Sequence, residues 1–253
     1  MKHKIYYLII LLFINLFSLN SYAENKDKNE IYFDVASLDQ AWNNMESKKG
    51  EDSILKFIQN VQNIPENFDV AWRISRLVYF IGNFGPGENL SNDEHIKVFE
   101  LGYKAGEIAK NLQPNRVEGY YWYAINLGKY SLAVGLFKAL RTAPMARDAL
   151  VEAAKIDPSY HWAGAYRILG RYYQDLPSGI SFGDKKKAEE YLTKAIQISP
   201  NFRLNTAYLA SLESDKDLKL KLFKEAENKP NTDGTIEEER YKEDLKLDIE
   251  KLN

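Results

Sequence analysis

Apolar residues recur at spacings of three and four along the chain, and strict apolar–polar alternation is missing. Such spacing places the apolar side chains on one face of a helix, whereas alternation would indicate strands. The first two faces of this kind are Leu38, Ala41, Trp42 and Met45, followed by Ile54, Phe57, Ile58 and Val61. The pattern predicts an all-α fold.

Prolines divide this helical pattern into units. Five follow the end of a predicted helix and begin a turn, namely Pro65, Pro114, Pro158, Pro200 and Pro230. The other three, Pro86, Pro144 and Pro177, fall between successive members of that set. Proline lacks an amide donor and clashes inside a helix, so we expect all eight between helices. The first four turn prolines are 49, 44 and 42 residues apart, which is typical of a helical repeat array.

Three units share a pattern of small and large residues. The clearest has Tyr166, Leu169, Gly170 and Tyr173, then Ala188, Leu192, Ala195 and Pro200. The preceding unit has Tyr120, Tyr123, Ala124 and Leu127, then Ala146, Leu150, Ala153 and Pro158. A weaker unit keeps Trp72, Tyr79, Gly102, Ala109 and Pro114. In all three, the first small residue of the second helix precedes the proline by 12 positions.

This pattern resembles the tetratricopeptide repeat. The resemblance implies an α-solenoid of about four helical hairpins, with a C-terminal helix that caps the last hairpin. Small residues such as Gly170 would lie where two helices approach closely. A helical bundle without repeats is the alternative.

The units are longer than the usual repeat of about 34 residues. The excess falls between the paired helices, at 82–92, 135–144 and 176–183. We expect these long intra-repeat inserts at one end of the stack, where they could form a binding edge.

Segments 118–124, 164–171, 175–177 and 182–188 resemble a narrower group of proteins. They are similar to the TatT-like T-component associated with TRAP transporters and to the regulator of microtubule dynamics family. The resemblance covers roughly 68–211. TatT proteins are typically lipid-anchored through a cysteine, and this chain has no cysteine.

The N-terminus has the pattern of a secretion signal. Lysines at positions 2 and 4 precede an apolar run over 5–17, and Ser21 and Ala23 precede a cut ahead of Glu24. The expected organisation is a signal peptide over 1–23, a lead-in over 24–36 and a repeat domain over 37–253. An uncleaved N-terminal anchor is the alternative. We expect a periplasmic or secreted protein with no membrane span after cleavage, and export argues against contact with microtubules.

The terminal helix is expected at about 236–252. Its apolar stripe consists of Tyr241, Leu245, Ile249 and Leu252. Glu238 stands four residues before Lys242, a spacing that favours an ion pair on the helix surface. A coiled-coil contact with a partner helix is the alternative to capping.

Charge and chemistry exclude several functions. The chain has 34 basic and 36 acidic residues, so it lacks the positive charge expected of a nucleic-acid-binding domain. His95 and His161 do not have the spacing of zinc ligands. The glycine-rich stretch 82–87 lacks the lysine of a phosphate loop. We therefore predict no cofactor, no metal and no catalysis, with an enzyme as the least favoured of three functions.

Four residues on the first helices are candidates for binding. Arg73, Tyr121 and Arg167 each follow a packing aromatic residue, and Arg171 lies one turn after Arg167. In the tetratricopeptide pattern these positions point to the inner surface, where a line of arginines could hold carboxylates. Ion pairs between repeats, or a solvated face, are the alternative.

The leading interpretation is therefore an exported, non-enzymatic interaction module that binds a protein or peptide partner through its concave face. The alternative is a periplasmic component that binds a small carboxylate or apolar ligand for a TRAP-type transport system.

Overall fold

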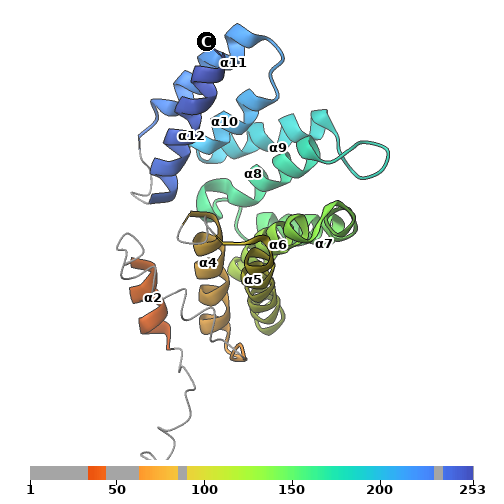
Figure 1. Cartoon of the computed structure of the whole chain (residues 1–253), viewed down its shortest axis with the longest axis vertical. Coiled ribbons are helices and arrows are strands. Elements are labelled where there is room, and N and C mark those ends of the chain that lie inside the picture. The colour runs from red at the N-terminus through yellow and green to blue at the C-terminus, as the bar shows by residue number, and fades with distance from the viewer. Residues whose placement is uncertain (1–33, 44–62, 85–89, 231–235, 253) are drawn as a thin grey trace, which may run out of the picture. The chain divides into compact units, whose positions relative to one another are not determined.

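The computed structural model describes residues 34–43, 63–84, 90–230 and 236–252 (Figure 1). The predicted signal peptide, its cleavage site and the apolar face at 54–61 lie outside these ranges.

Helices are the regular elements of the described residues (Figure 1). They are α2 Val35–Asn43, α4 Phe68–Phe84, α5 Asn92–Leu112, α6 Val117–Val134, α7 Leu136–Ile156, α8 Tyr160–Asp175, α9 Lys185–Ile198, α10 Arg203–Ser211, α11 Lys216–Glu227 and α12 Ile236–Leu252. Helices α4 to α11 form four successive pairs, and α12 follows the last pair. This arrangement confirms the all-α prediction of stacked helical hairpins.

The ends of the second helices repeat one geometry. The residue after each of α5, α7 and α9 donates its backbone N–H to the carbonyl of an alanine four residues earlier, and a proline follows. These alanines are Ala109, Ala153 and Ala195, and all are fully buried. The small side chains admit the neighbouring helix, and the proline prevents the helix from continuing.

The predicted insert at 135–144 is wrong. Helix α7 begins at Leu136, so Gly135 alone connects it to α6, and Pro144 lies inside α7. Proline leaves the carbonyl of Leu140 without its helical donor. The helix continues because its buried alanines, among them Ala139, Ala143 and Ala146, extend on both sides of the proline. The connection between α8 and α9 is a true loop, in which Ser178 forms isolated bridges with Ser181 and Phe182.

The predicted close approach at Gly170 is confirmed. A Cβ atom added there would lie 2.5 Å from Leu192 Cγ and 3.2 Å from the carbonyl oxygen of Ala188. Leu192 itself is fully buried. Glycine at this position therefore allows α8 and α9 to pack in contact.

The C-terminal helices share a separate apolar cluster. Its buried members are Ala207, Ala210, Phe223, Ala226, Leu245 and Ile249. Leu245 and Ile249 belong to the predicted stripe of α12, so this helix buries that stripe against α10 and α11.

A buried ion pair joins α10 to α12. Arg203 is 1% exposed, and its Nε lies 3.0 Å from Oε2 of the fully buried Glu238. The same guanidinium donates to the carbonyls of Glu227 and Lys229, each at 3.0 Å. Burial against Arg203 corrects the expectation that Glu238 lies on the helix surface.

None of the described helices combines the length and apolar character needed to cross a membrane.

Candidate functional site

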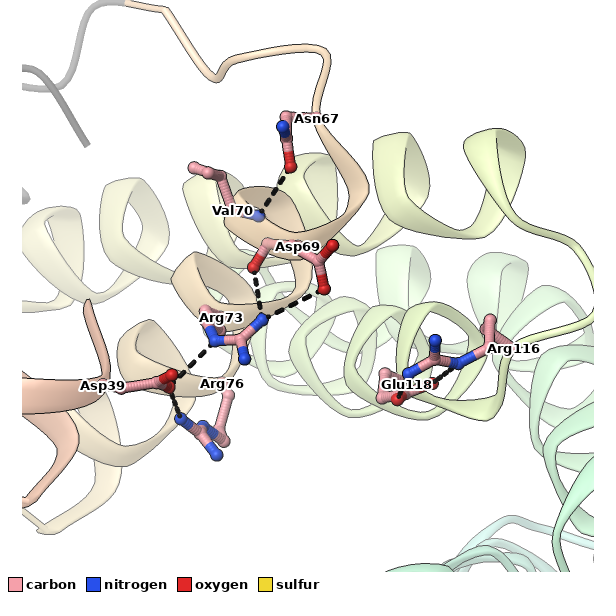
Figure 2. A network of polar contacts seen from close by, with 8 residues as sticks. All are labelled: Asp39, Asn67, Asp69, Val70, Arg73, Arg76, Arg116 and Glu118. Atoms are coloured by element: carbon pink, nitrogen blue, oxygen red, sulfur yellow. Dashed lines mark hydrogen bonds and ion pairs between the residues drawn. The ribbon is translucent and has the colours of Figure 1, made fainter. Parts of the chain in front are cut away.

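The four residues predicted to bind a partner do not form one solvent-reachable face. Arg73 on α4 is held by acids of its own chain (Figure 2). Its Nε lies 2.8 Å from Asp39 Oδ1 on α2, and its Nη1 lies 3.3 Å from Asp69 Oδ1. Arg73 therefore forms ion pairs within the chain, which was the alternative to binding a partner.

Tyr121 and Arg167 contradict the expectation of solvent access. They are 1% and 3% exposed, respectively. The Nη1 of Arg167 donates to the carbonyl of Trp162 at 3.0 Å and to Oδ1 of Asn205 at 3.1 Å. Its guanidinium also lies 4.5 Å from the centre of the Phe202 ring. Arg167 is thus engaged inside the protein.

Arg167 is buried because its guanidinium binds a left-handed turn at the start of α8. His161, Trp162 and Ala163 are left-handed, with φ of 49°, 53° and 60°. Each left-handed residue other than glycine costs about 1–2 kcal/mol. The carbonyl of Trp162 accepts hydrogen bonds from Arg167 and from Nδ2 of Asn205, which hold this turn in place. The expectation assumed a regular helix start and missed this turn.

Arg171 is the most accessible of the four, yet it also has partners. Its Nη2 lies 2.9 Å from Asp175 Oδ2, one turn further along α8. The guanidinium stacks at 4.7 Å from the centre of the Tyr208 ring.

A different arginine lies at the centre of a better candidate site. The guanidinium of Arg76 on α4 lies 4.0 Å from the ring centre of Trp42 and 4.8 Å from that of Trp72. Arg73 lies closer to the Trp72 ring, at 4.3 Å. The Nη2 of Arg76 lies 3.3 Å from Asp39 Oδ1 (Figure 2). Asp39 Oδ1 lies closer to Arg73 than to Arg76, so the ion pair of Arg76 with this shared carboxylate is the weaker one.

Among the described residues, the acid that pairs with Arg76 is Asp39, which Arg73 also contacts. The buried Nε of Arg76 has no hydrogen-bond partner among the described residues. Burial lowers the pKa of Arg76 to about 10, although Tyr160 and Asp39 act in the opposite direction. A buried cation with one ion pair at 3.3 Å is a candidate to bind an anion.

Aromatic side chains of α6 and α8 complete the surroundings of Arg76. The indole N–H of Trp122 donates to the hydroxyl of Tyr160 at 2.8 Å. Burial raises the pKa of Tyr160, and the nearby Arg76 opposes that shift. Tyr160 and Trp42 both remain partly exposed. We call Asp39, Trp42, Trp72, Arg76 and Tyr160 the Arg76 site.

His161 borders this site as a neutral ring. Its ring centre lies 5.3 Å from those of Tyr121 and Trp122. Burial lowers its pKa from 6.5 to about 3, and the charges of Arg167 and Arg76 add to this shift. The residue as a whole is half-buried. His161 thus adds a further aromatic ring to the surroundings of Arg76.

The arginines around the site share the nearby acids unequally. Figure 2 draws Arg73, Arg76 and Arg116 together with Asp39, Asp69 and Glu118. Arg116 pairs with Glu118, and its Nε to Oε2 distance is 3.2 Å. Arg73 takes both Asp39 and Asp69. Arg76 is therefore the least neutralised cation of this network.

Sequence reasoning passed over Arg76 because it considered only the residue after each packing aromatic. A usable signal was present, since Arg73 and Arg76 are three residues apart on one helix face, next to Trp72. The role of Trp42 was not visible, because its contact with α4 is long-range.

His161 gives a prediction about pH. The unfolded chain binds a proton near pH 6.5 and the folded chain only near pH 3. The contribution of the neutral His161 ring to the free energy of unfolding is therefore fully present above pH 6.5 and is lost as the pH falls toward 3. We expect the free energy of unfolding to drop by about 2 kcal/mol between about pH 7.5 and pH 5.

Urea unfolding of wild type and His161→Asn at several pH values tests this. Asparagine tolerates left-handed backbone and does not titrate in this range. The variant should lose most of the slope, and equal slopes in the two proteins would contradict the prediction.

Comparison with solved structures supports the repeat fold. A thermophilic TPR protein from Thermus thermophilus matches with a TM-score of 0.59 and 15% sequence identity. The match covers 85% of this chain and 100% of that one. At this identity the likeness concerns the fold alone.

Among curated proteins, none matches the chain. The family model described as regulator of microtubule dynamics protein 1-3 matches residues 34–176. This match includes the Arg76 site and spans more than half of the 253 residues. The chain therefore belongs to the regulator of microtubule dynamics protein 1-3 family.

Proposed function

We propose that the chain is a non-enzymatic interaction module that binds an acidic peptide segment of a partner protein at the Arg76 site. The tetratricopeptide-like fold indicates a module for protein interaction. The observation that carries the finer proposal is the Arg76 guanidinium beside two indole rings, with an Nε that has no hydrogen-bond partner among the described residues.

The chemistry of the site favours a carboxylate. Guanidinium binds carboxylates through two parallel hydrogen bonds, and this geometry needs donors that internal partners have not taken. Arg76 contacts Asp39 through Nη2 alone. The flanking indoles lower the local dielectric, which strengthens any ion pair formed there. Trp42, which is partly exposed, also offers flat apolar surface to the rest of a peptide.

The proposed setting is outside the cytoplasm, in the periplasm or the medium, because the N-terminal pattern favours export. In that setting the chain does not meet microtubules. Of what membership in the family suggests, the proposal uses only the repeat fold and a role in binding a partner.

A second candidate is a small carboxylate ligand, in keeping with the resemblance to TatT proteins. The aromatic side chains of Trp42, Trp72, Tyr160 and His161 around Arg76 favour it, since small-molecule sites are mostly apolar with few polar groups. A small ligand would need no contacts beyond these side chains, whereas a peptide would.

Arg76→Gln should weaken binding of an acidic peptide without unfolding the protein. The probe is a set of immobilised peptides that contain Asp or Glu, each paired with its Asn or Gln counterpart. Loss of a charge-assisted hydrogen bond should cost about 1.5–3 kcal/mol, or roughly 10- to 150-fold in Kd. Isothermal titration of the best peptide measures this, and added salt should weaken binding.

Arg171→Gln is the matched control, because Arg171 also stacks on an aromatic ring but is paired by Asp175. It should bind like wild type. Thermal unfolding must show that both variants are folded. Equal binding by wild type and Arg76→Gln would refute the peptide site. Displacement of the peptide by succinate at comparable affinity would favour the small carboxylate instead.

A further inference from the structure

The tip of the α6–α7 hairpin exposes large apolar side chains. Phe137 is 91% exposed, Leu132 and Leu136 are each 67% exposed, and Val134 is 45% exposed. These four residues, which we call the apolar tip, lie within six consecutive positions around Gly135. Single exposed apolar residues are common, but a contiguous group usually marks an interaction surface.

The backbone that carries the apolar tip is well anchored. The N–H of Gly135 donates to the carbonyl of Ser131, and the side-chain oxygens of Thr142 and Ser131 are 2.6 Å apart. Asn92 at the start of α5 donates to the carbonyl of Ala133 at 3.2 Å. The exposed side chains are therefore held outward by the fold, and a loose loop does not account for their exposure.

Charge around the apolar tip has one sign along the chain. The stretch 119–147 contains no acidic residue and has four basic ones, Lys129, Lys138, Arg141 and Arg147. Lys138 and Arg141 follow Phe137 within about one helical turn, and Lys138 lies 5.3 Å from the centre of the Tyr130 ring. On the neighbouring α5, Asp93 and Glu94 follow Asn92, and Glu94 is engaged by Ser91 in a capping box.

We infer that the apolar tip docks on an anionic lipid surface. Projecting apolar side chains with basic residues behind them are typical of segments that lie in the interface of a bilayer. The apolar groups enter the boundary between headgroups and acyl chains, and the stems of lysine and arginine let their charges reach the phosphates. A deformable bilayer can receive such a protrusion without a shaped groove. This inference is independent of the Arg76 site.

A fluorescent label at the tip tests the inference in the full chain. The protein has no cysteine, so Phe137→Cys provides a single site for an environment-sensitive dye such as NBD. Ser214→Cys, in the exposed connection between α10 and α11, is the matched control. The probes are vesicles of phosphatidylcholine, with and without phosphatidylglycerol.

The label at position 137 should shift to the blue and be quenched by nitroxide lipids only on vesicles that contain phosphatidylglycerol. The label at 214 should not respond. The signal reports the tip itself, so binding through another segment does not produce it.

Substitutions in the unlabelled chain give the magnitude. Leu136→Ser with Phe137→Ser should weaken vesicle partitioning by about tenfold or more. Lys138→Gln and Arg141→Gln should each weaken it by about fivefold. Absence of a response at position 137 on both kinds of vesicle would overturn the inference. A response of the label at 137 to an added protein, and not to vesicles, would also overturn the inference, since the apolar tip would then bind a protein.

Discussion

Replacing Arg203 with methionine is expected to lower the free energy of unfolding by about 3–5 kcal/mol. The change leaves the fully buried carboxylate of Glu238 without its cation. It also removes the donors to the carbonyls of Glu227 and Lys229, which lie at the end of α11 and in the connection to α12. Urea unfolding at neutral pH measures the loss.

Two further variants separate the buried charge from a general effect of substitution. Lys216→Met changes an exposed basic residue at the start of α11 and should leave stability nearly unchanged. Arg203→Met combined with Glu238→Leu removes both charges and should be less destabilising than Arg203→Met alone. A single variant as stable as the Lys216 control would show that this ion pair does not hold α12.

Replacing Gly170 with leucine is expected to cost about 3 kcal/mol or more, at the upper end of the overpacking range. Even the first added carbon would lie 2.5 Å from Leu192 Cγ, and Leu192 is fully enclosed, so it has nowhere to move. Helices α8 and α9 would have to separate, which would weaken the contacts of the α8–α9 hairpin.

Gly170→Ala provides the graded comparison, because it adds one carbon in place of four. We expect a smaller loss for alanine, partly offset by its better helix propensity. Thermal unfolding of both variants tests the order. An unchanged midpoint for Gly170→Leu would place the close crossing elsewhere and contradict the repeat register.

Sequence patterns predicted the helices and turns well because these depend on neighbouring residues. Pro114, Pro158 and Pro200 each follow a helix end, as their spacing indicated. Pro144 is the exception, since the buried alanine face of α7 outweighs the hydrogen bond lost at Leu140. Local rules cannot weigh a local cost against packing with another helix.

The candidate site could be predicted only in part. The pattern directed attention to arginines on the first helices and selected Arg73 and Arg167, whereas the structure makes Arg76 the better candidate. Arg73 has two acids and Arg167 holds a left-handed turn. Neither partner set is visible without knowing which residues face each other across helices.

The sequence by itself determined the all-helical class, the repeat period, the small positions where helices meet and the family of the chain. These properties follow from spacing along the chain, which sets the face of a helix that each side chain occupies. Only the tertiary structure decided which cations are compensated. Asp39 reaches Arg73 and Arg76 across 34 and 37 residues, and Glu238 reaches Arg203 across 35. Electrostatic compensation depends on distances in space and on burial, so it emerges only when the helices pack together.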